Sequence, residues 1–285
     1  MAADPSTTPV PRTAIVAGGA RGCGRAVALA LARAGADIAV CDLGDHPYQS
    51  LDYRTASGND LESTAALVRA AGRRAMTVTV DVRDHAAVSS VPDLVEAELG
   101  PVTDLVVTAG VVSVVPLTAM TRGDWDEVLD TNLTGAFNVM QAVVSRMRPR
   151  GAGRAVLVCG QEARRGAHSL SHVSAAGWAL IGMAKSIALE VAASGVTINV
   201  VAAGPVGSPQ LLDSISYQQI LAGPAEAAAT GPAVERIAAA MPQPRPYLQP
   251  EEVADAVVFL MSRQARSITG AVLDVSLGLA GRNSA

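Results

Sequence analysis

The chain has 285 residues, of which 49% are hydrophobic and 17% charged, so it can bury a large core and is not disordered. Its net charge of −4 excludes a broad basic surface for nucleic acid. Its three cysteines, Cys23, Cys41 and Cys159, lie far apart and form neither a disulfide framework nor a metal-ligand motif.

Residues 1–12 are polar and rich in proline, without the charged start and apolar stretch of a signal peptide. They predict a flexible tail in front of a single domain at 13–285. We expect no apolar run to be long enough to cross a bilayer. The sequence therefore predicts a cytoplasmic protein with no membrane partner.

Seven short apolar segments alternate with helical segments along this domain. The alternation predicts an α/β fold: a doubly wound parallel sheet (Rossmann fold) of about seven strands. The strands are expected at 13–16, 37–41, 75–80, 104–107, 155–159, 197–201 and 271–275. The helices are expected at 25–34, 60–71, 91–99, 124–146, 171–193 and 251–262. A segment rich in Pro, Ala and Gly, at about 205–250, is predicted to form a helical lid over a small-molecule pocket.

A glycine-rich turn follows the first predicted strand and leads into the first helix. Gly18, Gly22 and Gly24 let the backbone approach a pyrophosphate, whose charge the helix N-terminus attracts. Asp42 ends the next strand, where a carboxylate accepts hydrogen bonds from an adenosine ribose. This carboxylate repels a 2′-phosphate, so NAD is favoured over NADP. Arg21 is the counter-signal, because a guanidinium beside the turn could pair with that phosphate.

With this turn as its first motif, the chain resembles the short-chain dehydrogenase/reductase family over residues 13–278. Residues 17–24 resemble its Thr-Gly-x-x-x-Gly-x-Gly motif, and 131–135 resemble the helix segment that carries its catalytic asparagine. The segments at 53–84 and 246–253 resemble the mycofactocin-associated, carveol-dehydrogenase-like members, which retain NAD tightly. The resemblance implies an NAD site formed by Gly18, Arg21, Gly22, Cys23, Gly24, Asp42, Leu43, Asp81, Val82, Ala109, Gly110, Val206 and Ser208.

The family's catalytic Ser, Tyr and Lys have no counterparts at the matching positions. A gapless alignment puts Val173 at the tyrosine position, Gly177 at the lysine position and Gly160 at the serine position. None of these side chains can move a proton, so the ordinary ketone–alcohol mechanism is predicted to be absent. The pocket beside the nicotinamide is therefore predicted to offer no phenol and no ammonium group. A Tyr hydroxyl and a Lys amine from another segment, such as Tyr217 or Lys185, within reach of the nicotinamide would overturn this prediction.

Four residues are candidates for catalysis in this altered site. The alignment retains Asn132, and Glu162 in an apolar cleft would have a raised pKa and act as acid or base. Gln161 beside it and His168 on the same loop are the other two, and His172 starts the next helix. Each also has a structural interpretation: Glu162 could pair with nearby arginines, and the histidines could be ordinary loop and helix-start residues.

Three functions remain open at this point. The first is an NAD(H)-binding enzyme that transfers hydride to or from a small organic molecule without the usual Tyr/Lys proton donor. The second is a non-redox cyclase, isomerase or lyase on the same scaffold, and the third is a catalytically silent NAD-binding protein. The resemblance also implies a homotetramer or homodimer, in which the helices at 124–146 and 171–193 pair with those of another copy.

Overall fold

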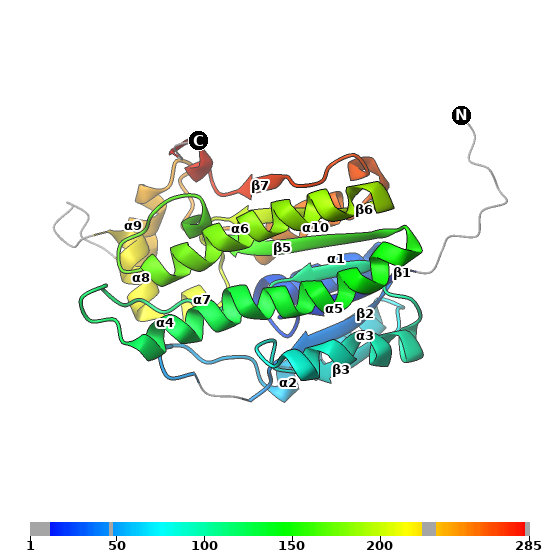
Figure 1. Ribbon diagram of the computed structural model, residues 1–285. Coiled ribbons are helices and arrows are strands. Elements are labelled where there is room, and N and C mark those ends of the chain that lie inside the picture. Colours follow the sequence, from blue (N-terminus) through cyan, green and yellow to red (C-terminus); the bar gives the residue numbers. More distant parts are fainter. Residues whose placement is uncertain (1–11, 46–47, 224–231, 283–285) are drawn as a thin grey trace.

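The computed structural model describes residues 12–45, 48–223 and 232–282. Within these ranges seven strands form one sheet in the order β3-β2-β1-β4-β5-β6-β7, and all neighbouring pairs are parallel (Figure 1). The strands are β1 (Arg12–Ala17), β2 (Ala36–Asp42), β3 (Ala75–Thr79), β4 (Asp104–Val107), β5 (Gly153–Gly160), β6 (Val196–Ala203) and β7 (Val272–Val275). The predicted doubly wound sheet of seven strands is confirmed.

Helices cover both faces of the sheet (Figure 1). One face carries α1 (Gly22–Arg33), α2 (Gly58–Ala70) and α10 (Pro250–Leu260). The other carries α3 (His85–Leu99), α5 (Gly135–Arg150) and α6 (Ser171–Val191). Strands β1 and β6 are consequently buried along almost their whole length, which explains why their sequences are mostly apolar.

The strand order reverses beside β1, whose neighbours in the sheet are β2 and β4. Such a switch point leaves a crevice beyond the carboxyl ends of the two central strands, and open α/β sheets bind their ligands there. Gly18 follows β1 and Thr108 follows β4, and both line a cavity at this edge. The fold therefore places the glycine-rich turn where a ligand is expected.

The helix predicted at 124–146 is interrupted. It consists of α4 (Arg122–Leu129), a π-helical turn named η1 (Asp130–Thr134), and α5. A π-helical turn accommodates one extra residue, which the spacing of apolar residues does not reveal.

Two other boundaries differ from the predicted ones. Arg12, expected to end the tail, is the first residue of β1, and residues 1–11 lie outside the described part of the chain. Helix α3 begins at His85 because the Asp84 side chain accepts a hydrogen bond from Ala87 N at 3.0 Å and caps it.

The predicted lid segment contains three short helices in its described part. They are α7 (Pro209–Leu212), α8 (Ile215–Ala222) and α9 (Ala233–Ala240). Residues 224–231 lie outside the described residues. A β-bridge between Val206 and Leu248 joins the two ends of the segment, so the segment leaves the domain and returns to it at one place.

One helix has the length and apolarity of a membrane span, contrary to the expectation from the sequence. The stretch Ser171–Ser194 meets this description by length and composition alone. Leu180 and Ala184 on one side of it are buried in the core beneath the sheet, whereas Trp178 and Leu189 are exposed. Its apolar sequence thus serves packing on one side and leaves an apolar face on the other.

Candidate active site

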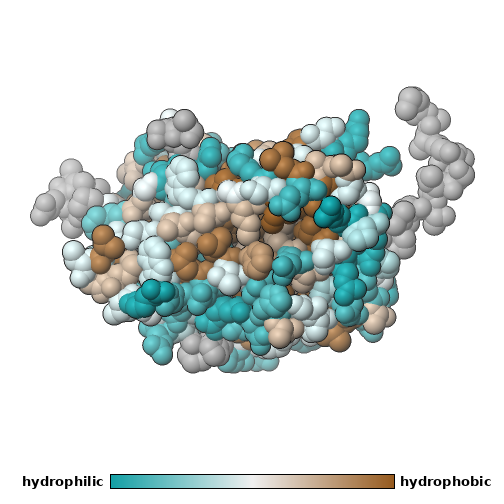
Figure 2. Space-filling model, viewed as in Figure 1, coloured by the Kyte–Doolittle hydropathy of each residue, from teal (hydrophilic) through white to brown (hydrophobic). Residues whose placement is uncertain are grey.

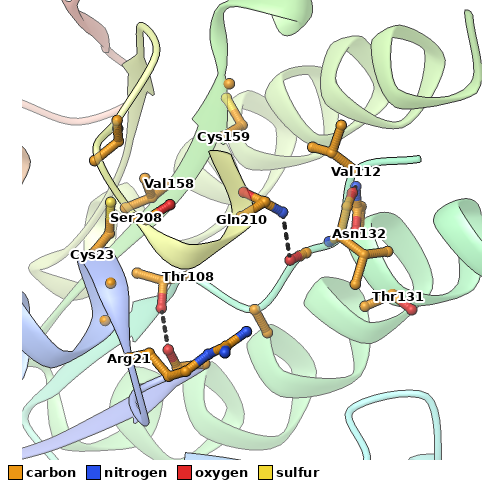
Figure 3. Close-up of a pocket in the computed structure, with 18 of the residues that line it drawn as sticks. Arg21, Cys23, Thr108, Val112, Thr131, Asn132, Val158, Cys159, Ser208 and Gln210 are labelled. Carbon is orange, nitrogen blue, oxygen red and sulfur yellow. Dashed lines mark hydrogen bonds between the residues drawn. The ribbon is translucent and has the colours of Figure 1, made fainter. Parts of the chain in front are cut away.

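A cavity of about 260 Å³ opens at the carboxyl edge of the sheet. Its wall is formed by the β1–α1 turn, the ends of β4, β5 and β6, one side of α6 and the start of the lid segment. Figure 3 shows Arg21 and Cys23 from the turn, Asn132 from η1, Cys159 from β5 and Gln210 from α7 converging on this space. The cavity thus occupies the crevice that the strand order creates.

The β1–α1 turn packs so closely on the end of β4 that side chains are excluded. A Cβ at Gly18 would collide with the backbone of Ala109, and a Cβ at Gly24 would collide with the carbonyl oxygen of Gly18. Gly18 also has a φ of +83°, a backbone conformation that residues with a Cβ rarely adopt. Helix α1 begins without a side-chain cap, so its first N–H groups are available to an anion in the cavity.

The Asp42 carboxylate is fixed at the end of β2 by two backbone donors. Ala20 N donates to Oδ2 at 3.0 Å, and Leu43 N donates to Oδ1 at 2.8 Å. Burial raises the pKa of Asp42, while these N–H groups and the Arg21 guanidinium act in the opposite direction. The Arg21 side chain donates a hydrogen bond to the carbonyl oxygen of Arg54, so its guanidinium is already engaged by the protein.

All the residues predicted to bind the cofactor line this cavity: Gly18, Arg21, Gly22, Cys23, Gly24, Asp42, Leu43, Asp81, Val82, Ala109, Gly110, Val206 and Ser208. Their contacts with a cofactor stay a prediction. The geometry shows that segments spread over nearly 200 residues of sequence form one continuous wall.

Gly160, Val173 and Gly177, which align with the family's catalytic positions, line the same cavity. The short turn η2 (Gln161–Ala163) fills the space that side chains at two of them would need. A Cβ at Gly160 would collide with the Glu162 carboxylate, and a Cβ at Gly177 would lie 2.6 Å from Ala163 Cβ. The glycines at 160 and 177 and the position of η2 therefore depend on one another.

Glu162 is buried at 7% exposure and lines the cavity. Its Oε1 accepts a hydrogen bond from the Tyr217 hydroxyl at 3.2 Å. Burial raises the pKa of Glu162, and burial together with the nearby carboxylate raises the pKa of Tyr217 well above its usual range. The carboxyl group is thus the member of this pair that can exchange a proton, while the phenol stays protonated.

Tyr217 corrects one prediction from the sequence. It lines the cavity from α8, as Tyr48 and Tyr53 do from the connection between β2 and α2, so the part of the expectation that excluded a phenol from this site is wrong. Lys185, the sequence's only lysine, is exposed, and its Nζ donates to the carbonyl oxygen of Gly270 at 3.0 Å, outside the cavity wall. Near Tyr217 the sequence indicates only a helix start, which Ser214 caps. A helix start does not reveal which part of the protein the tyrosine ring faces.

Asn132 lines the cavity from the π-helical turn but is engaged elsewhere. Its Nδ2 donates to Val111 O and its Oδ1 accepts from Val111 N, both at 2.8 Å. This pair of bonds holds the loop after β4 against η1. The side chain therefore positions the cavity wall in this structure.

Gln161 and His168 are not brought to the cavity wall, and the structure gives no support to the catalytic role predicted for them. The Gln161 amide points away and donates to Asp274 at 2.7 Å, while His168 is an exposed loop residue. The sequence could not show that the 3-10 turn η2 directs the Gln161 side chain away from the cavity that Glu162 lines. His172 is also off the wall: it is fully buried, its Nε2 is 2.7 Å from Ser113 Oγ, and burial lowers its pKa.

Two segments far apart in the sequence are fastened to each other beside the cavity. Gln210 Nε2 of α7 donates to Tyr53 Oη at 3.2 Å. It also donates to Gly110 O at 3.3 Å, the bond drawn from Gln210 in Figure 3. The Asp52 carboxylate accepts from the N–H of Ser216 at 3.0 Å and from its hydroxyl at 2.7 Å. The connection between β2 and α2 thus holds the lid segment in place, a feature the sequence analysis missed.

Comparison with known proteins agrees with this architecture. Residues 12–219 match the family described as short chain dehydrogenase. The chain belongs to this family. The (-)-trans-carveol dehydrogenase of Rhodococcus erythropolis is 30% identical over 273 residues, which cover 94% of this chain and 96% of that protein. The acetoacetyl-CoA reductase of Rhizobium meliloti is 34% identical over 267 residues, which cover 94% of this chain and 98% of that protein.

Solved structures of the family have the same fold. The crystal structure of carveol dehydrogenase from Mycobacterium avium in complex with NAD superposes with a TM-score of 0.87 at 29% identity. The match covers 95% of this chain and 98% of that one. The predicted membership of the family, with carveol-dehydrogenase-like relatives, is confirmed.

The packing of η2 predicts different outcomes for two glycine variants. Gly177→Ala is expected to destabilise the protein by about 1–3 kcal/mol, because the new methyl group meets Ala163 and its backbone. Gly160→Ala should destabilise far less, since its obstacle is the flexible end of Glu162, which can rotate away. Urea denaturation measures both free energies of unfolding, and equal losses would contradict this packing.

Proposed function

We propose that the protein is an NAD-dependent oxidoreductase that transfers hydride between NAD and a small organic molecule. In this proposal Glu162 takes the place of the family's tyrosine and lysine as the acid–base group. The observation that carries the proposal is that Glu162 lies on the wall of the same cavity as the glycine-rich turn. One cavity can then hold the cofactor and its reaction partner together.

The residues of the turn fit a dinucleotide. The uncapped N-terminus of α1 suits the pyrophosphate, and the fixed Asp42 carboxylate suits the adenosine ribose. Asp81 and Val82, after β3, are the proposed adenine contacts. When bound, NAD supplies the hydride acceptor or donor, and the relative from Mycobacterium avium was solved in complex with NAD.

The proposed reaction also requires a group that accepts or donates a proton, and in this chain that group must differ from the family's tyrosine. Alcohol oxidation requires a base for the hydroxyl proton, and carbonyl reduction requires an acid for the developing alkoxide. Gly160, Val173 and Gly177 offer neither. The Glu162 carboxylate can accept the proton and its protonated form can donate it, and burial raises the pKa of Glu162, which makes the carboxylate a stronger base than an exposed one.

The cavity wall favours an uncharged, largely apolar substrate. Val112, Val173, Leu180 and Leu211 line it beyond the glycine-rich turn. Among the cavity-lining residues that the structure describes, Arg21 alone is cationic, and it belongs to the β1–α1 turn. A substrate carboxylate or phosphate would therefore meet no cationic side chain on the described cavity wall near Glu162.

Asp42→Asn is expected to reduce the preference for NAD over NADP by about tenfold or more. The change keeps the shape of the side chain but removes the charge that repels a 2′-phosphate. Fluorescence titration of both nucleotides measures the ratio of their Kd values. Asp45→Asn, on the same connection but exposed, is the matched control. An unchanged ratio in Asp42→Asn contradicts the assignment of Asp42 to the ribose.

Glu162→Gln is expected to lower kcat about 100-fold or more, because general acid–base catalysis contributes on this scale. The Kd of NAD should change little, since Asp42 and the turn remain. In the unaltered protein, alcohol oxidation should fail as the pH drops through the raised pKa of Glu162, because only the carboxylate is a base. The change in nicotinamide absorbance with a panel of apolar alcohols and ketones measures kcat and its pH dependence.

Glu98→Gln, on the exposed side of α3, is the control for this experiment. Full activity in Glu162→Gln would contradict the role of Glu162. Product formation without a change in nicotinamide absorbance would support the non-redox alternative. NAD binding without turnover of any compound in the panel would support the silent alternative.

We also propose that α5 and α6 form the contact with a second copy of the chain. Phe137, Trp178 and Leu189 on these helices are exposed, and Figure 2 shows apolar side chains gathered along this face. Trp178→Glu is expected to shift a dimer or tetramer to a smaller species, because it places an unpaired charge in the contact. Sedimentation measures the mass, with Leu94→Glu on α3 as the control, and an unaltered mass contradicts the proposed contact.

A further inference from the structure

The Glu162 carboxyl group is held between two parts of the chain that are distant in sequence. Glu162 belongs to η2, directly after β5, whereas Tyr217 belongs to α8 in the lid segment. The Tyr217 hydroxyl donates to Oε1 at 3.2 Å, and Oε2 occupies the place of the absent Cβ of Gly160. The lid thus holds one oxygen, and the other lies over bare backbone at the end of β5.

Few groups compete with Tyr217 for this carboxyl. Burial raises the pKa of Glu162, while its own backbone N–H, then the Tyr217 hydroxyl, then the Arg165 guanidinium on the loop after η2 lower it. Burial raises the pKa of the Cys159 thiol at the end of β5 to about 12, so the thiol is neutral. Tyr53 is near enough to raise the pKa of Tyr217 slightly further. Among the described side chains, Tyr217 alone donates a hydrogen bond to Glu162.

The position of Tyr217 depends on how α8 is anchored. Ser214 caps the helix by accepting a hydrogen bond from Tyr217 N at 3.1 Å. The residue directly before Tyr217 is Ser216, and its N–H and hydroxyl both donate to the Asp52 carboxylate. The first turn of α8 is therefore tied to the connection between β2 and α2. With the lid docked in this way, the hydroxyl of Tyr217 reaches Glu162.

We propose that Tyr217 is a positioning residue for Glu162, and that docking of the lid makes this carboxyl competent for proton exchange. The inference rests on the function proposed above for Glu162. In alcohol oxidation the substrate's C–H bond breaks, the hydride passes to NAD, and the hydroxyl proton passes to the Glu162 carboxylate. Tyr217 keeps its proton throughout and donates a hydrogen bond to the carboxylate. Carbonyl reduction is the reverse of these transfers.

Tyr217→Phe keeps the ring and removes the hydroxyl. We expect kcat to fall about tenfold to a hundredfold, the range expected for a hydrogen bond to a charged group, with KM changed less than about threefold. The acidic limb of the kcat profile for oxidation should move up by about one pH unit, because the carboxylate loses a donor that stabilises it. Tyr247→Phe, outside the cavity wall, is the matched control and should leave the profile unchanged. A Tyr217→Phe profile equal to the control overturns the proposal.

Asp52→Ala tests the lid separately, without touching Tyr217 or Glu162. It should lower kcat and move the acidic limb in the same direction. The double variant Asp52→Ala/Tyr217→Phe should be no slower than Tyr217→Phe alone, because both changes remove the same hydrogen bond. Additive losses overturn the coupling between lid docking and Glu162. If Tyr217→Phe proves too unstable to assay, the acidic limb of Asp52→Ala alone decides the question, and an unmoved limb overturns the proposal.

Infrared pH-difference spectroscopy gives a readout that needs no substrate. The carboxyl band that disappears in Glu162→Gln reports the titration of Glu162, and in Tyr217→Phe it should titrate at higher pH. If turnover is absent in the unaltered protein but this shift is present, the proposed function fails and the pairing stands. If turnover is present but neither the band nor the kinetic profile moves, the pairing fails and the proposed function stands.

Discussion

The functional edge of this protein depends on one close contact, the packing of the β1–α1 turn on the end of β4. Gly18 touches the backbone of Ala109, and Gly24 lies against the carbonyl oxygen of Gly18. This contact brings α1 to the sheet with its N-terminus open to the cavity and with no side chain in the way. The same geometry leaves N–H groups that an anion satisfies better than water, which is why the turn suits a pyrophosphate.

A second constraint acts farther along the cavity, where small residues and η2 determine one another. Gly160 makes room for the Glu162 carboxylate, and Gly177 makes room for Ala163. A larger side chain at either position would have to displace part of η2. If Gly160 and Gly177 stand at the family's serine and lysine positions, as the sequence alignment predicts, volume as well as chemistry excludes those side chains here, and in our proposal the space holds a different acid–base group.

The convergence of four of the residues predicted for the nucleotide site could be foreseen because each lies at the end of a strand or within two residues after it. Parallel strands end at one edge of a sheet, so Gly18, Asp42, Asp81 and Ala109 had to converge once the strand order was known. Tyr217 was not predictable in this way, because it belongs to a connection whose path follows no repeating pattern. Gln161 is the converse case: its place beside Glu162 suggested a shared role, but a 3-10 turn directs the two side chains to different sides.

By itself the sequence determined the family, the alternation of strands and helices, and the residues of the glycine-rich turn. These follow from local properties: apolar periodicity, conformations open to glycine, and residues at strand ends. Only the tertiary structure decided that Glu162 is buried, that a lid tyrosine hydrogen-bonds to it, and that Asp52 anchors that lid. Burial and long-range hydrogen bonds depend on which segments meet in space, and no short stretch of sequence contains that information.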